Sequence, residues 1–190
     1  IVHAGQACCS SKRFIVQENI YDEFAGRLAE RLKGMKIGDP LDQGSRIGPL
    51  IDERAAQRVE EIVDRTVKAG AYCLCGGRRF DGNFFEPTVL TGVTPAMDIA
   101  QNLEVFGPVF PLIKFKTEEQ AVAIADNCTY GLSSGVISGE IQRAIRVARQ
   151  LDAGNCTING TGLYRTHDMP FGGHRKSGLG TEGLYATLDE

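Results

Sequence analysis

The feature that most constrains this chain is the regular alternation of strand-like and helix-like segments in its second half. Between residues 109 and 159, short apolar runs alternate with segments whose apolar side chains recur at helical spacing. The expected strands are 109–115, 132–137 and 155–159, and the expected helices are 117–127 and 140–151. Short strand–helix–strand connections favour parallel strands with helices on the sheet faces. The sequence therefore predicts an α/β fold, a three-layer αβα domain with a mainly parallel sheet.

The first half of the chain contains the same kinds of element with less regular connections. Residues 13–17 and 71–75 have strand character, and 84–90 is extended, with Pro87 indicating an edge or irregular position. Two helices are expected, one from Asn19 to Gly34 and one over 52–69. Their apolar stripes are Tyr21, Phe24, Leu28 and Leu32 in the first and Ala55, Val59, Ile62, Val63 and Val67 in the second. Cys73 and Cys75 are expected as small apolar residues on one face of a strand.

Length and charge narrow the class of protein. A chain of 190 residues is long enough for one full-sized domain, and no linker-like stretch divides it. A net charge of −3 gives no electrostatic reason to expect nucleic acid or an anionic membrane as a partner. The sequence has no apolar run near the roughly 20 residues of a membrane span and no secretion signal, so we expect the cytoplasm or an organellar matrix, with free thiols.

The first thirteen residues contain the one stretch where local chemistry favours a reactive thiol. Cys8 and Cys9 follow a Gly-Gln pair and precede two serines, Lys12 and Arg13. Cations and hydrogen-bond donors stabilise a thiolate, which is the nucleophilic form of cysteine. Both thiols share this environment, so spacing alone does not choose between them, and free cysteine is more often a small core residue. His3 leaves a cysteine hydrolase as a further reading, although no supporting Asn or Asp pattern accompanies it.

Two later stretches have a composition suited to ligands. Glu104 is followed by Phe106 and a Gly-Pro bend, which offers one acceptor for a ribose diol and one flat apolar surface for a nicotinamide ring. Taken alone, this stretch is better explained by a turn entering a strand, with a solvated glutamate. Residues 169–180 are rich in glycine and basic residues but lack the spacing of known phosphate loops, so we expect a closely packed irregular loop. His167 and His174 have no obvious third partner, and we expect no metal site.

These three stretches, in this order, resemble the C-terminal half of the NAD(P)-dependent aldehyde dehydrogenase superfamily. Gly5-Gln6-Ala7-Cys8 matches the family's Gly-Gln-x-Cys motif, and Glu104-Val105-Phe106-Gly107-Pro108 matches its Glu-x-Phe-Gly-Pro motif. Pro170-Phe171-Gly172-Gly173, followed by Lys176-Ser177-Gly178, matches a third signature. The resemblance covers essentially the whole chain, including the stretch 83–88.

The resemblance implies a role for each motif. Cys8 would be the nucleophile and Cys9 a neighbour lining the pocket. Glu104 would hold the ribose next to the nicotinamide of NAD or NADP, Phe106 would pack near that ring, and Phe171 would contribute to the aldehyde pocket. The implied reaction is thiolate attack on an aldehyde to give a thiohemiacetal, hydride transfer to NAD(P), and hydrolysis of the thioester to a carboxylic acid. The Cys8 backbone N–H would supply part of the oxyanion stabilisation.

The resemblance also indicates what this stretch does not contain. The family's general-base glutamate, its dinucleotide-binding domain and its final subunit-pairing strand have no counterpart in the 190 residues. We therefore expect a catalytic, cysteine-bearing domain that is inactive alone and belongs to a homodimeric or homotetrameric enzyme. A CoA-acylating aldehyde dehydrogenase and a non-catalytic thiol domain of the same fold are the alternatives. Neither the aldehyde nor the choice between NAD and NADP can be deduced from these residues.

Overall fold

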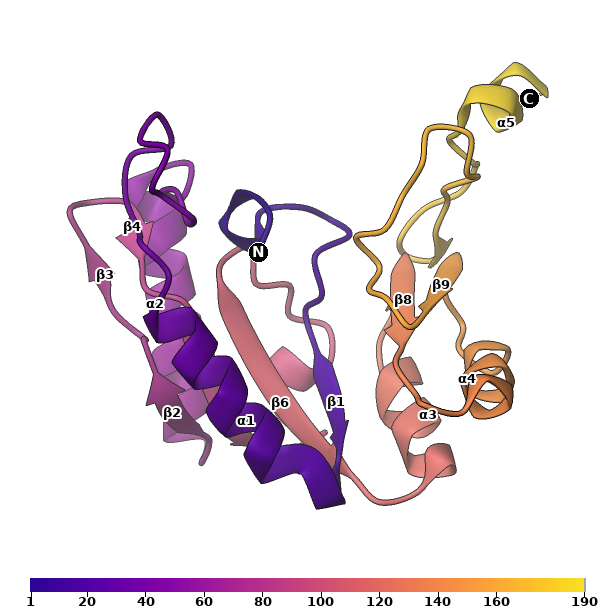
Figure 1. Cartoon of the computed structure of the whole chain (residues 1–190), viewed down its shortest axis with the longest axis horizontal. Coiled ribbons are helices and arrows are strands. Elements are labelled where there is room, and N and C mark those ends of the chain that lie inside the picture. Colours follow the sequence, from indigo (N-terminus) through magenta and orange to yellow (C-terminus); the bar gives the residue numbers. More distant parts are fainter. Residues whose placement is uncertain (190) are drawn as a thin grey trace. The chain divides into compact units, whose positions relative to one another are not determined.

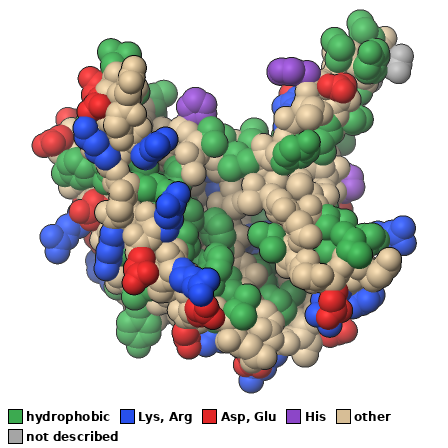
Figure 2. Space-filling model, in the orientation of Figure 1, with side chains coloured by type: hydrophobic (Ala, Val, Ile, Leu, Met, Phe, Trp, Pro, Cys, Tyr) green, Lys and Arg blue, Asp and Glu red, His purple; other side chains and the backbone are tan. Residues whose placement is uncertain are grey.

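A computed structural model describes residues 1–189 and divides the chain into two compact units, residues 1–117 and residues 118–190. Figure 1 shows the helices and strands of each unit, coloured along the sequence. In the described residues, no helix is long and apolar enough to cross a membrane. On the face shown in Figure 2, acidic and basic side chains lie next to one another, in keeping with the small net charge of −3.

The first unit is built on a four-stranded sheet in the order β1-β6-β5-β2. Its strands are β1 (Phe14–Gln17), β2 (Tyr72–Cys75), β5 (Thr88–Val93) and β6 (Val109–Phe115). β1 and β5 both pair with β6 in parallel, and β2 pairs antiparallel with β5. The sheet is therefore mixed and mainly parallel, which confirms the predicted α/β class.

Helices cover both faces of this sheet (Figure 1). α1 (Glu18–Lys33) packs its buried residues Tyr21, Ala25, Ala29 and Leu32 against Val16, Val89 and Leu112 of the strands. On the opposite face, where alternate strand residues point, Thr88, Leu90, Pro111 and Ile113 are also fully buried. α2 (Glu53–Lys68) lies behind the sheet in Figure 1 and buries Ala56, Val59, Ile62, Val63 and Thr66. The result is the predicted arrangement of helix, sheet and helix.

Several predictions about single residues in this unit are wrong. Phe24 and Val67 are 37% and 38% exposed, because smaller residues, Ala25 and Thr66, take the buried positions instead. Pro87, in contrast, lies in the irregular stretch between β4 (Phe84–Phe85) and β5, one of the two positions expected for it, and β5 itself is an inner strand between β6 and β2.

Cys73 and Cys75 do not share one face of their strand. A register shift pairs Cys73 with Leu90 and Cys75 with Val89, and neighbouring residues of β5 point to opposite faces. Cys75 accordingly packs against the α1 cluster, whereas Cys73 does not belong to it. The prediction assumed that residues two apart on a strand share a face, and the β-bulge between Cys73 and Cys75 breaks that alternation.

The second unit contains a two-stranded parallel sheet of β8 (Ser133–Val136) and β9 (Asn155–Ile158). Helix α4 (Ile141–Ala148) connects these strands and contacts both of them, while α3 (Glu118–Asp126) precedes β7 (Tyr130–Gly131). β7 pairs antiparallel with β10 (His174–Arg175), and α5 (Leu184–Asp189) follows. The predicted strands and helices are present, each one to three residues shorter at an end.

The short elements of the first unit lie in its connections. They are the 3-10 helices η1 (His3–Gly5) and η2 (Asp98–Ala100), and the hairpin of β3 (Arg79–Phe80) with β4 (Phe84–Phe85). Two glycines next to these connections permit a close backbone approach. A Cβ on Gly5 would lie 2.2 Å from the carbonyl oxygen of Gly107, and a Cβ on Gly107 would lie 2.7 Å from a methyl group of Val59. The chain before β1 is therefore stacked on the chain before β6, which is stacked on α2.

This stacking predicts that Gly5→Ala destabilises the first unit. The new methyl group would overlap the Gly107 carbonyl, and Gly5 has a left-handed φ of +81° that alanine adopts only with strain. We expect the free energy of unfolding in urea to fall by about 2–4 kcal/mol, the sum of overpacking and left-handed backbone costs. Gly26→Ala is the matched control, because a Cβ there meets nothing within 4 Å in α1. It should stabilise by roughly 0.5–1 kcal/mol, and equal effects of the two variants would contradict the stacking.

Candidate functional site

The first two sequence motifs meet at one edge of the sheet. The thiol segment precedes β1 and the Glu104–Pro108 segment precedes β6, and these strands are parallel neighbours with Phe14 opposite Leu112. Segments that enter adjacent parallel strands lie at the same end of the sheet. The topology therefore brings Cys8 and Glu104 together across 95 intervening residues, at the amino ends of the strands.

Cys8 lies on a tight turn rather than in a regular element. The N–H of Ser10 donates to the carbonyl of Ala7 at 3.1 Å, which leaves Cys8 and Cys9 as the two central residues of the turn. Both thiols are free, with Cys8 exposed and Cys9 half-buried. Within residues 1–189, the backbone N–H of Cys8 donates to no acceptor. The turn thus presents one exposed thiol with an available N–H on the same residue.

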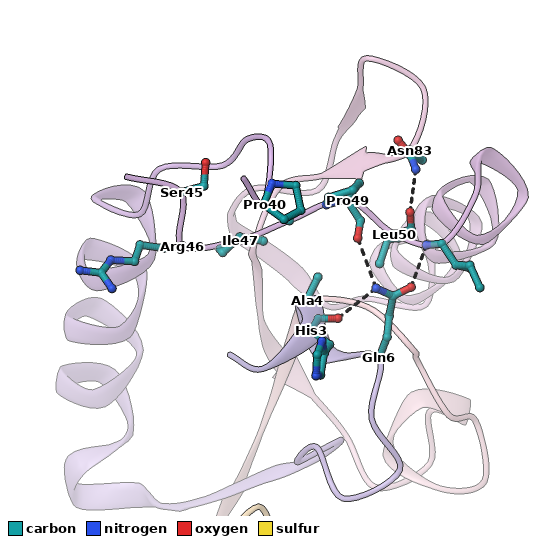
Figure 3. A pocket seen from close by; sticks show the side chains of 12 residues that line it. His3, Ala4, Gln6, Pro40, Ser45, Arg46, Ile47, Pro49, Leu50 and Asn83 are labelled. Carbon is teal, nitrogen blue, oxygen red and sulfur yellow. Dashed lines mark hydrogen bonds between the residues drawn. The ribbon is translucent and has the colours of Figure 1, made fainter. Parts of the chain in front are cut away.

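Gln6 of the first motif anchors the turn (Figure 3). Its Nε2 donates to the carbonyls of His3 at 2.9 Å and Pro49 at 3.3 Å, and its Oε1 accepts from the N–H of Ile51 at 2.9 Å. A single amide side chain therefore fixes the thiol segment to the loop that leads into α2. Sequence reasoning treated this glutamine only as part of a motif, since its partners are backbone groups that a sequence does not reveal.

A cavity of about 510 Å³ lies beside this anchor (Figure 3). It is lined mainly by the segments 3–6 and 45–51, together with Pro40 and Asn83. Cys8 is not among its lining residues, whereas His3 is. Within the described chain, no hydrogen bond joins His3 to Cys8. The structure therefore gives no support to a Cys–His pair of the kind a cysteine hydrolase needs.

Lys12 links the two motifs. Its Nζ donates to the carbonyls of Gly5 at 3.1 Å, Ala7 at 3.2 Å and Val105 at 3.3 Å. The same ammonium lies 4.1 Å from the centroid of the Phe106 ring. Burial lowers the pKa of Lys12 below that of an ordinary lysine, and the nearby charges of Glu104, Cys8 and Cys9 oppose that shift.

The other residues predicted at this edge differ in solvent exposure and in hydrogen-bond partners. Glu104 is half-buried, and Phe106 is exposed over 43% of its surface although it is large and apolar. Arg13, the second cation expected near the thiols, donates to the carbonyl of Ala100 at 3.3 Å. Lys12 hydrogen-bonds to the thiol segment itself.

The third motif belongs to the second unit. Phe171 is 7% exposed, its N–H and C=O pair with Glu182 at 2.7 Å in both directions, and the Arg165 guanidinium lies 4.1 Å from its ring centroid. Arg165 also pairs with the Glu182 carboxylate at 3.1 Å. A Cβ on Gly172 would come within 2.6 Å of the Gly180 carbonyl oxygen. These contacts describe the closely packed loop that we expected rather than a phosphate cradle.

Two basic residues of this loop, His174 and Arg175, anchor it to acidic residues earlier in the chain. Arg175 donates to both the Asp152 carboxylate and the carbonyl of Asp126, and His174 Nδ1 lies 2.9 Å from Asp152. Hydrogen bonds from His174 and Arg175 lower the pKa of Asp152. In the described residues, no group of three or more His, Cys, Asp or Glu side chains is arranged to hold a metal ion. His174 and Arg175 thus link this loop to the segments of Asp152 and Asp126.

Comparison with known proteins identifies the family of this chain. The sequence profile of the Aldehyde dehydrogenase family matches residues 1–190. Succinate-semialdehyde dehydrogenase of Rattus norvegicus mitochondria is 44% identical over 99% of this chain and 36% of its own length. Glutarate-semialdehyde dehydrogenase of Pseudomonas putida is 42% identical over 94% and 37% respectively. The chain thus spans less than two fifths of the length of these two relatives.

Solved structures give the same result. Succinate-semialdehyde dehydrogenase from Burkholderia pseudomallei superposes with a TM-score of 0.93 at 42% identity, over 98% of this chain and 39% of that one. Betaine aldehyde dehydrogenase from Staphylococcus aureus, solved with NAD+, superposes with a TM-score of 0.93 at 37% identity, over 98% and 38%. Family profile, relatives and fold agree, and the chain belongs to the aldehyde dehydrogenase family.

Proposed function

We propose that this chain supplies the cysteine-bearing catalytic part of an NAD- or NADP-dependent aldehyde dehydrogenase, with Cys8 as the nucleophile. The observation that carries the proposal is the exposed Cys8 thiol on a turn that Lys12 joins to the Glu104–Phe106 segment. Cys9 is half-buried on the same turn and is proposed to line the pocket. Phe171 of the third motif is proposed to contribute to the aldehyde pocket.

The proposed chemistry is centred on one sulfur atom. The Cys8 thiolate attacks the carbonyl carbon of the aldehyde, a C–S bond forms, and the carbonyl electron pair moves to oxygen to give a thiohemiacetal oxyanion. The Cys8 backbone N–H, which has no acceptor within residues 1–189, is a suitable donor for that oxyanion. Collapse of the oxyanion expels a hydride and leaves a thioester. Water then cleaves the C–S bond, releasing a carboxylic acid and the thiol.

The cofactor's proposed contribution is to accept the hydride. The residues beside Cys8 suit a nicotinamide nucleoside, since Phe106 offers a ring that is 43% exposed and Glu104 offers a carboxylate two residues earlier. A carboxylate accepts hydrogen bonds from a ribose diol, and an aromatic face packs against a flat ring. Structural neighbours of this chain were solved with either dinucleotide: GapN from Methanocaldococcus jannaschii with NADP and the S. aureus enzyme with NAD+.

The remaining functions are proposed to come from outside these residues. We assign the general base and the dinucleotide-binding domain to other parts of the complete gene product, so that turnover by the 190-residue chain alone should be negligible. The complete protein is proposed to be a homodimer or homotetramer that acts on small aldehydes in the cytoplasm or an organellar matrix, without nucleic acid or membrane partners.

Cys8→Ala tests the nucleophile. In the complete gene product, this variant should lower kcat for aldehyde oxidation by about a thousandfold or more, the scale on which loss of a covalent nucleophile acts. Cys73→Ala removes another exposed thiol of the same unit and serves as the matched control, with activity near that of the unsubstituted protein. Near-normal kcat in Cys8→Ala would refute the assignment. Product analysis with and without CoA in the same assay distinguishes hydrolysis from CoA acylation.

The substrate proposal rests on Arg165. Two relatives are named for succinate and glutarate semialdehydes, each of which carries a carboxylate at the end opposite the aldehyde. Arg165 lies over the ring of Phe171, and its guanidinium already pairs with one carboxylate, that of Glu182. A planar guanidinium binds a carboxylate through two parallel hydrogen bonds. We propose that Arg165 recognises the carboxylate of a semialdehyde substrate.

Arg165→Leu in the complete protein should therefore raise KM for succinate semialdehyde by about ten- to a hundredfold, the loss expected for a hydrogen-bonded charge pair. KM for an uncharged aldehyde of similar length should change less than about twofold, because that substrate makes no charge pair. Arg149→Leu, an exposed arginine after α4, is the matched control. Equal KM changes for charged and uncharged substrates would argue against a carboxylate-binding role.

A further inference from the structure

Lys12 has a role that neither of the two motifs beside it requires. It lies four residues after Cys8, yet one of its hydrogen bonds crosses 93 residues of sequence to the carbonyl of Val105. Its other two acceptors, the carbonyls of Gly5 and Ala7, belong to the thiol segment itself. A single side chain thus joins the thiol turn to the segment that contains Glu104 and Phe106.

Each N–H donor of the Lys12 ammonium has a hydrogen-bond partner in this arrangement. A lysine ammonium has three N–H donors and no acceptor, and here it has three carbonyl partners at 3.1, 3.2 and 3.3 Å. With all three donors engaged, the ammonium has no N–H left for a substrate. Its geometry therefore suits a group that holds other groups in place rather than one that exchanges protons.

The same ammonium also orients an aromatic ring. It lies 4.1 Å from the centroid of Phe106, which is the geometry of a cation–π contact. The cation occupies one face of the ring, and 43% of the Phe106 surface stays exposed. A planar ligand that packs on this ring is therefore offered the surface that the lysine does not cover.

The orientation of the thiol turn relative to the Glu104–Phe106 segment does not come from backbone pairing between them. Within residues 1–189, no backbone–backbone hydrogen bond joins the segment 5–10 to the segment 104–107. The contact between Gly5 and Gly107 sets how close the two segments approach, but a glycine contact of this kind has no directional preference. The three hydrogen bonds of Lys12, two to the thiol segment and one to Val105, add a directional link between the two segments.

We propose that Lys12 is a positioning residue that sets the placement of the Cys8 thiol relative to the Phe106 ring and the Glu104 carboxylate. This inference rests on the proposed function, in which the thiol and the ring act on the aldehyde and the nicotinamide. Lys12 affects the reaction through the two segments it joins, because displacing a reacting group by about 1 Å costs on the order of a hundredfold in rate.

The test compares Lys12→Met and Lys12→Arg in the complete gene product, with Lys33→Met, at the exposed end of α1, as the matched control. Methionine keeps the length of the side chain and removes the charge and all three donors. We expect Lys12→Met to lower kcat and raise KM for the dinucleotide by about tenfold or more each, with KM for the aldehyde little changed. Arginine restores charge and donors, so Lys12→Arg should recover most of the loss.

A pH profile separates positioning from simple packing. The charged groups that face the ammonium are Glu104, Cys8 and Cys9, and burial lowers the pKa of Lys12. As pH rises, the ammonium therefore loses its charge earlier than an ordinary lysine would. Dinucleotide KM should rise on the alkaline side in the unsubstituted protein, and this rise should be missing in Lys12→Arg, whose guanidinium stays charged.

Two results would overturn the inference. One is a dinucleotide KM and a kcat in Lys12→Met within twofold of the unsubstituted protein. The other is a loss of activity in Lys12→Met that is proportional to the fraction of unfolded protein. In that case the folded variant would keep the dinucleotide KM of the unsubstituted protein and the same rise of that KM at alkaline pH. Cys8→Ala is assayed in parallel: if that variant is active, the proposed function fails, whereas an inactive Cys8→Ala with a normal Lys12→Met refutes the positioning role alone.

Discussion

The approach of Gly5 to the Gly107 carbonyl is the contact on which the candidate site depends. Because neither residue has a side chain, Val59 of α2, the backbone at Gly107 and the backbone at Gly5 stack directly on one another. Any larger residue would push the thiol turn away from the Glu104–Phe106 segment. The parallel pairing of β1 with β6 brings the two segments to the same edge of the sheet, and the glycines determine how near they come. Sheet topology and glycine packing are thus both needed to form the site.

Most of the fold could be predicted from the sequence, because apolar periodicity reports which face of an element is buried. The predicted helices over 52–69 and 117–127 are observed as Glu53–Lys68 and Glu118–Asp126. Failures occur where one residue changes the local register or where size outweighs hydrophobicity. The bulge after Cys73 sends two cysteines to opposite faces, and close packing of α1 on the sheet selects Ala25 over the bulkier Phe24.

The site could be predicted only in part. Motif resemblance predicted Cys8, Glu104 and Phe106 as site residues, and the sheet topology places the segments that contain them at one edge of the sheet. The functions of Gln6 and Lys12 could not be deduced, since all their partners in this site except the Phe106 ring are backbone groups, some of them more than 40 residues away. A sequence shows which side chains can donate hydrogen bonds, but it does not show which carbonyls the fold brings within their reach.

Backbone strain explains why the thiol turn needs such anchors. His3, Ala4 and Gly5 have φ values of +47°, +53° and +81°, three consecutive residues in the left-handed region. For non-glycine residues this conformation costs about 1–2 kcal/mol each, and it persists only where surrounding contacts determine it. Gln6 supplies one such contact by donating to the His3 carbonyl, and Lys12 supplies another by donating to the carbonyl of Gly5. The two side chains that fix the thiol turn also hold the strained backbone just before it, so that relaxation of this strain would displace Cys8 from the edge of the sheet.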